Sequence, residues 1–192
     1  MNKIILDLCG GTGSWSKPYV DAGYEVHNIT LPKYDVKDFY LKTTDKIYGI
    51  LAAPPCTMFS VARRTAKTPP DYVGALSIVD ACMRIIRQAS LNGYLKFWAL
   101  ENPRGKLRYF MGIPKNTFYQ WQFGGQFKKP SDVWGYYNDP TPTVKKEPHF
   151  NVDKSWQKPI CPPEYLDLGL KRVDIRAITP EQFAKAFFKV NK

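Results

Sequence analysis

The sequence lacks the marks of several protein classes. It has only two histidines and four cysteines, and Cys9, Cys56, Cys82 and Cys161 stand singly, without CxxC or CxxH spacing. We therefore expect no bound metal and reduced thiols. No apolar run approaches the roughly 20 residues of a membrane-spanning helix, and no signal-like segment is seen. We expect one monomeric cytoplasmic domain without membrane contact.

Acidic residues are scarce relative to basic ones. The chain has 28 Lys and Arg against 17 Asp and Glu, a net charge of 28 − 17 = +11 that is spread along the sequence. A basic surface suits a polyanionic partner, because each phosphate contact releases counterions. The same charge is compatible with a merely basic protein, so charge alone does not establish nucleic-acid binding.

Short apolar strands alternate with helices over the first 100 residues. The pattern predicts strands at 3–10, 24–31, 46–53 and 95–103 and helices at 14–23 and 71–93. This alternation predicts an α/β fold with a mostly parallel sheet and helices on both faces. After residue 112 we expect two more strands, with turns at Gly124–Gly125 and Asn138–Pro140. A last helix should follow Thr179 as its N-cap.

The first candidate site segment is "LDLCGGTG", which places Asp7 at a strand end before Gly10, Gly11 and Gly13. Glycines let the backbone turn tightly and approach a ligand closely. The spacing departs from the full dinucleotide-binding fingerprint. A nucleotide-like cofactor site and a plain strand-to-helix turn therefore both remain open.

The second segment is "PPCTMFS", just past another strand end. Its two prolines stiffen the backbone and hold Cys56 in a fixed direction. Positive charge nearby activates a thiol by stabilising its thiolate, and Arg63 and Arg64 follow closely in the sequence. The alternative is a buried cysteine that acts as a small hydrophobe, as we expect for Cys9 and Cys82.

The third segment is "FWALENP", in which Glu101 and Asn102 follow four apolar residues at a strand end. A carboxyl group emerging from an apolar strand should be partly desolvated, which raises its pKa. Such a group suits a hydrogen bond to an amino-bearing ring nitrogen. The alternative role is a helix cap.

In this order, "DLCGGTG", "PPCTMFS" and "LENP" resemble motifs I, IV and VI of the DNA cytosine-5 methyltransferases, which read roughly DLFxGxG, PPCQxFS and ENV. "KKPSDVWG" resembles a segment of compact, phage-type members, and "RAITPEQFAKAF" resembles the family's C-terminal motif. The resemblance covers nearly the whole chain. It implies a Rossmann-like methyltransferase fold with one catalytic domain at 1–192. Residues 135–175 would form a short irregular insert in place of a target-recognition domain.

The resemblance also implies an activity, the transfer of a methyl group from S-adenosylmethionine to C5 of cytosine in DNA, in a bacterial or phage-infected cell. Cys56 would attack C6 of the base, and Glu101 would hold N3 and the exocyclic amine. The implied cofactor contacts are Asp7, Gly11, Thr12, Gly13, Asp35 and Pro54, with Trp15 as the candidate for stacking on adenine. The implied nucleic-acid contacts are Ser60, Arg63, Arg64, Lys67, Asn102, Lys128 and Lys129.

Several positions depart from the family pattern. Cys9 stands where the family has a stacking Phe, and Thr30 stands near the expected ribose-binding acid. The basic QxRxR motif is absent, which leaves Lys128 and Lys129 as the available cations. Only about 40 residues separate "DVWG" from the last motif, against on the order of 100 for a recognition domain. Two alternatives therefore stay open: the same chemistry on a free cytosine nucleotide or RNA, and a catalytically silent nucleic-acid-binding protein.

Overall fold

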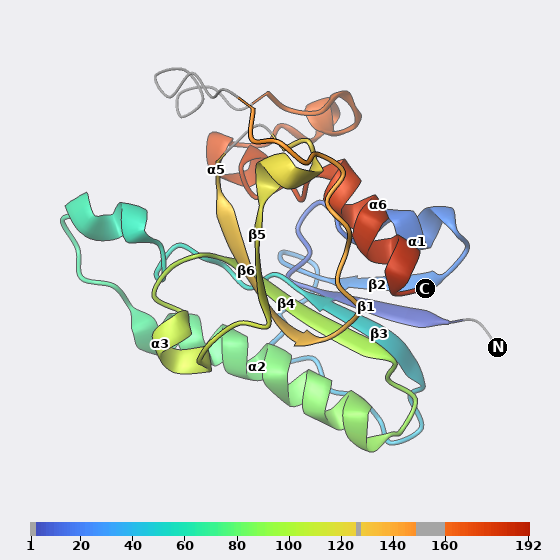
Figure 1. Ribbon diagram of the computed structural model, residues 1–192. Coiled ribbons are helices and arrows are strands. Elements are labelled where there is room, and N and C mark those ends of the chain that lie inside the picture. Colours follow the sequence, from blue (N-terminus) through green and yellow to red (C-terminus); the bar gives the residue numbers. More distant parts are fainter. Residues whose placement is uncertain (1–2, 126–127, 149–159) are drawn as a thin grey trace.

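The computed structural model describes residues 3–125, 128–148 and 160–192, which form a layered α/β fold (Figure 1). Its six-stranded sheet has the order β2-β1-β3-β4-β6-β5. The strands are β1 (Ile4–Leu8), β2 (Glu25–Ile29), β3 (Ile47–Ala52), β4 (Phe97–Pro103), β5 (Asn116–Tyr119) and β6 (Pro130–Tyr136). The first four run parallel, whereas β6 is antiparallel to β4 and β5 is antiparallel to β6. The α/β prediction is confirmed, but the sheet is mixed.

Helices cover both faces of this sheet (Figure 1). The long α2 (Tyr72–Leu91) packs on one face, and α1 (Lys17–Asp21) and α6 (Glu181–Val190) pack on the other. Successive strand side chains point to opposite faces, so Leu6 joins the core beside α2 while Ile5 joins the core beside α6. Both strand faces are therefore buried, which explains the short continuous apolar runs of the sequence.

Short helical turns occupy the connections. They are η1 (Val61–Thr65), α3 (Arg108–Met111), η2 (Gln120–Phe123), η3 (Pro163–Leu168) and α5 (Arg172–Ile175). The predicted irregular insert at 135–175 contains the end of β6 together with η3 and α5, and its residues 149–159 lie outside the described residues.

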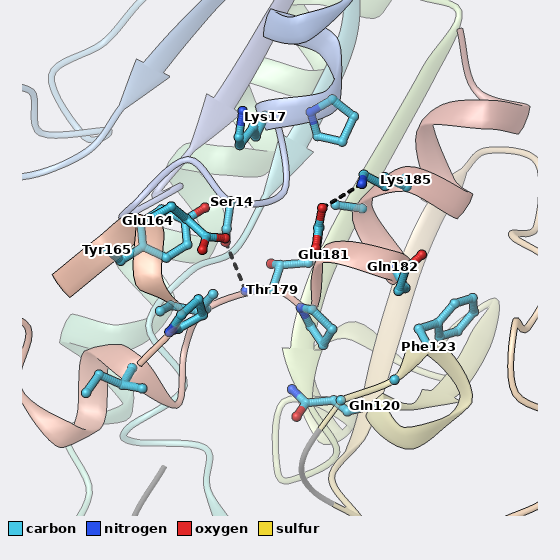
Figure 2. A pocket seen from close by; sticks show the side chains of 18 of the residues that line it. Ser14, Lys17, Gln120, Phe123, Glu164, Tyr165, Thr179, Glu181, Gln182 and Lys185 are labelled. Carbon is cyan, nitrogen blue, oxygen red and sulfur yellow. Dashed lines mark hydrogen bonds and ion pairs between the residues drawn. The ribbon is translucent and has the colours of Figure 1, made fainter. Parts of the chain in front are cut away.

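The last helix begins one residue later than the sequence predicts. Pro180 is the N-cap of α6, and no side chain caps the helix. Thr179, the predicted N-cap, instead donates its backbone N–H to Ser14 Oγ at 2.9 Å (Figure 2). This bond ties the C-terminal segment to the turn after β1. The tertiary contact therefore replaces the local cap.

Candidate active site

Three strand ends meet at one edge of the sheet. The parallel register pairs Asp7 with Leu51 and Ala52 with Leu100, so the segments that follow β1, β3 and β4 emerge together. They open into a pocket of about 450 Å³ whose lining includes Asp7, Cys56 and Glu101. The carboxyl edge of a parallel sheet is where α/β folds bind ligands. The structure thus brings the three sequence segments to one site.

The turn after β1 depends on glycine at two positions. A Cβ on Gly10 would lie 2.3 Å from the Asp7 Cγ, and Gly11 has a φ of 55°, which glycine adopts without strain. The Gly11 N–H donates to Thr30 Oγ1 at 3.3 Å, and the Gly11 carbonyl accepts from Asn28 Nδ2 at 3.1 Å. Thr30 and Asn28 therefore hold the loop against the end of β2.

Asp7 is fully buried beneath this turn. Its Oδ2 accepts a hydrogen bond from Ser16 Oγ at 2.5 Å, whereas its Oδ1 accepts none from the described residues. Burial raises the pKa of the Asp7 carboxyl to about 6, because the charged form loses hydration that one hydroxyl only partly replaces. The wall of the pocket thus carries a desolvated carboxyl group, one oxygen of which has no hydrogen-bond partner among the described residues.

The Pro-Pro-Cys turn is held from inside the protein. Asn102 is fully buried, and its Nδ2 donates to the Pro54 carbonyl at 2.8 Å. Asn102 was predicted to contact nucleic acid. Its burial rules out such a surface role, because the amide is committed to fixing the backbone two residues before Cys56. This hydrogen bond explains why an asparagine stands next to Glu101 in the sequence.

Cys56 is half-buried in the pocket wall. Burial raises the pKa of its thiol, and the negative charge of Glu101 raises it further, whereas the positive charges of Lys129 and Arg176 lower it. The sequence pointed to Arg63 and Arg64 as the stabilising charges. The two cations that lower the pKa of Cys56 instead come from distant segments: Lys129 directly precedes β6, and Arg176 directly follows α5.

The carboxyl group of Glu101 has a raised pKa, as the sequence predicts. Burial at the end of β4 is the main cause, and Asp132 adds to it. The charge of Lys129 and a hydrogen bond with the Ser131 side chain act in the opposite direction. The group therefore keeps its proton to a higher pH than an exposed glutamate does.

Lys129 lies in the pocket rather than on an outer surface. Its charge acts on both Cys56 and Glu101, and its Nζ donates to the Arg176 carbonyl at 3.4 Å. Lys128, the neighbouring cation of the sequence prediction, pairs with Glu147 at 2.6 Å on the surface. Lys128 thus forms a surface ion pair, and of the two lysines only Lys129 belongs to the site.

The other predicted cofactor contacts divide into two groups. Gly11, Thr12, Trp15 and Pro54 line the pocket. Trp15 is only 3% exposed and packs edge-on against Phe187 at 5.3 Å, so its ring forms the floor and offers no open stacking face. Gly13 supports the turn by donating its N–H to the Gly10 carbonyl at 2.9 Å. Asp35 is outside the lining and bonds Lys37 instead.

The predicted nucleic-acid residues after Cys56 lie in and around η1. Arg64 and Lys67 are exposed, and Ser60 is half-buried. Arg63 is different, because its guanidinium donates to the Thr68 carbonyl at 2.7 Å and to its hydroxyl at 3.1 Å. Arg63 therefore closes its own loop. Arg64 and Lys67 are the cations that this loop offers to a partner.

The segment 177–179 forms a wall of the pocket that sequence reasoning missed. It also separates this pocket from a second one of about 420 Å³, shown in Figure 2, which contains neither Cys56 nor Glu101. Around that second pocket, lysines pair with acids on their own helices, Lys17 with Asp21 and Lys185 with Glu181. The pocket beside Cys56 is therefore the candidate active site.

Two further observations concern metal ligands and membrane-spanning helices. Within residues 3–125, 128–148 and 160–192, no group of three or more His, Cys, Asp or Glu side chains is placed to hold a metal ion. No helix in this same part of the chain has the length and apolar character needed to cross a membrane.

Neither a scan against protein-family models nor a search of curated proteins finds a match to this chain. The functional conclusion therefore depends on the residues of the site and their geometry.

Proposed function

We propose that the protein transfers a methyl group from S-adenosylmethionine to C5 of cytosine in DNA, on a Rossmann-like methyltransferase fold. One observation carries the proposal: a cysteine, a half-buried glutamate and a lysine line one pocket beside a glycine turn. Cys56 and Glu101 are the two residue types that activation of a cytosine ring through C6 requires. All five segments that resemble methyltransferase motifs contribute residues to the pocket.

The thiol and the carboxyl group have complementary tasks. The Cys56 thiolate attacks C6 of cytosine, and Glu101 binds N3 and the exocyclic amine, where its proton offsets the charge that enters the ring. C5 thereby becomes the nucleophile and would take the methyl group, with S-adenosylhomocysteine as the leaving group. A base would then take the proton from C5, and the Cys56 thiolate would be expelled from C6. The raised pKa of Glu101 favours the protonated form that this step needs.

The positive charge of Lys129 acts on both Cys56 and Glu101. Its positive charge lowers the pKa of Cys56 and therefore increases the thiolate fraction at a given pH. The same charge acts on Glu101, the group that would hold the ring when the thiolate adds. Lys129 is thus a cation that the pocket offers in a sequence without the arginines of the family's basic motif.

The residues beside Cys56 fit S-adenosylmethionine. The pocket volume, about 450 Å³, lies in the range of roughly 300–1,000 Å³ that small-molecule sites occupy. Asp7, whose buried Oδ1 has no hydrogen-bond partner among the described residues, places an acidic group in the lining that suits a cationic ligand. The absence of a side chain at Gly11 leaves open space for close approach. When bound, this cofactor supplies the methyl group.

The test is to express the protein, digest cellular DNA to nucleosides and measure 5-methyldeoxycytidine. The product should appear with the natural chain and fall to background with Cys56→Ser. Cys161→Ser is the matched control, because Cys161 lies outside the pocket, and it should retain the product. Absence of 5-methyldeoxycytidine while the folded protein binds the cofactor in calorimetry would refute the proposal.

The open pocket and the short insert also favour testing smaller substrates. Labelled cofactor incubated separately with DNA, RNA and dCMP ranks the three. Transfer to DNA is the expected result, and transfer to RNA or dCMP alone would reassign the substrate.

A further inference from the structure

An exposed surface beside the pocket combines cations with an unburied aromatic ring. Arg64 and Lys67 lie in and after η1, and Arg104, Lys106 and Tyr109 lie before and in α3; we call these two exposed segments together the η1–α3 surface. Figure 1 shows η1, in cyan, and α3 on the same side of the molecule. Tyr109 is 84% exposed, so its ring is accessible to a partner.

The η1–α3 surface is joined directly to the segment that carries Cys56. The Lys106 N–H donates to the Phe59 carbonyl at 2.8 Å, and the ring of Phe59 contacts that of Phe110 at 6.1 Å between centroids. Phe59 follows Cys56 by three residues, and Arg104 follows the pocket residue Pro103. A strand whose base entered the pocket would therefore cross this surface.

The short α3 is also held in place. Arg108 Nε donates to Asp132 Oδ2 at 2.5 Å, and its Nη2 donates to Thr117 Oγ1 at 2.8 Å, which fixes α3 to β6 and β5. Asp132 is fully buried, so the ion pair is protected from solvent. Tyr109, next to Arg108, is therefore presented outward from a fixed support.

The four cations of this surface are uncompensated. Across the part of the chain that the structure describes, Arg64, Lys67, Arg104 and Lys106 form no ion pair with a carboxylate. Lysines elsewhere on the surface do form such pairs, for example with Asp21, Asp139 and Glu181. The surface thus has a local positive charge that suits phosphates.

We infer that the η1–α3 surface binds the target DNA as a single strand, with a base next to the cytosine stacked on Tyr109. This inference rests on the proposed function and names the form of its substrate. An aromatic face is useful only to an unstacked base, because a duplex covers the faces of its bases. Cations interleaved with an exposed aromatic ring are the arrangement that single-strand binding requires. The surface would thereby take the place of a target-recognition domain, for which the chain is too short.

Fluorescence anisotropy with a labelled 20-mer that contains one cytosine tests the inference. The oligonucleotide is measured single-stranded, annealed to its complement, and as the equivalent RNA, all without cofactor. The single DNA strand should bind more tightly than the duplex and at least as tightly as the RNA. Tighter binding of the duplex or of the RNA would overturn the inference.

Substitution of Tyr109 supplies the decisive comparison. Tyr109→Ala should weaken single-strand binding about 5- to 100-fold, the range expected for one base–aromatic stack, and Tyr109→Phe should retain it. The control is Tyr136→Ala, since Tyr136 is 73% exposed and pairs with Trp98 at the opposite end of β4. An equal effect of both alanine variants, or no effect of Tyr109→Ala, refutes stacking on this ring.

Salt dependence separates the charge contribution. Replacing Arg104 and Lys106 with glutamine should reduce the slope of log affinity against log salt by about 1.4, or roughly 0.7 for each phosphate of the single strand that the variant no longer neutralises. An unchanged slope would contradict the role of these cations. The binding assay needs no turnover, so failure of methyl transfer and failure of strand binding are observed independently.

Discussion

Asp7 offers a quantitative test of the site, because its burial makes stability depend on pH. The carboxyl group has a pKa of about 6 in the folded protein, against 3.8 for the group in water. The difference, 6 − 3.8 = 2.2, corresponds at 1.36 kcal/mol per pH unit to about 3 kcal/mol. Burial causes this unfavourable contribution, and the hydrogen bond that Asp7 accepts from Ser16 Oγ offsets it only in part.

The direction of the pH dependence follows from the number of protons that Asp7 binds in the folded and in the unfolded state. Below about pH 4, Asp7 is protonated in both the folded and the unfolded chain and contributes no pH dependence. Between about pH 4 and 6 the folded state retains a proton that the unfolded state has released, so stability falls as the pH rises. Above pH 6 the full cost of about 3 kcal/mol is present.

Asp7→Asn removes the charge and keeps the shape and the acceptor for Ser16 Oγ. The variant should be more stable than the natural protein by up to about 3 kcal/mol at pH 7.5, and the difference should shrink towards pH 4. Urea unfolding followed by tryptophan fluorescence at pH 4, 5, 6 and 7.5 measures this. Calorimetry should show weaker cofactor binding, because the anionic acceptor is lost.

Asp80→Asn is the control, since Asp80 is exposed on α2 and its replacement should change stability little at any pH. A stability difference for Asp7→Asn that stays constant from pH 4 to 7.5 would refute the argument from burial. Lower stability of Asp7→Asn at pH 7.5 would refute it as well.

Two further variants test the surroundings of Cys56. Lys129→Gln removes a charge that lowers the pKa of Cys56, so alkylation of this thiol by iodoacetamide, followed by mass spectrometry, should slow at pH 8 and require higher pH. An unchanged rate at Cys56, with Cys161 as the internal reference, would exclude that influence. Asn102→Leu removes the donor to the Pro54 carbonyl, and leaving this acceptor unpaired should cost about 1–3 kcal/mol in urea unfolding. Retention of full stability would show that the bond contributes nothing.

Local patterns in the sequence were sufficient to locate the three strand ends. Asp7, Cys56 and Glu101 each follow a short apolar run, and the carboxyl ends of parallel strands necessarily share one edge. The raised pKa of Glu101 follows from the same pattern, because a carboxyl group at the end of a buried strand loses hydration. These conclusions need only the strand period and the direction of the chain.

The tertiary structure decided which groups surround those three residues. Lys129 and Arg176 act on the Cys56 thiol from segments more than 70 positions away, while Arg63, close in sequence, bonds its own loop. Asn102 is an internal anchor, since its side-chain amide on β4 donates a hydrogen bond to the Pro54 carbonyl, just past the end of the neighbouring β3. Such contacts depend on strand order and on the antiparallel return of β6, which no local periodicity encodes. The sequence by itself therefore determined that Cys56 and Glu101 lie at neighbouring strand ends, and the packing of distant segments determined their charge environment.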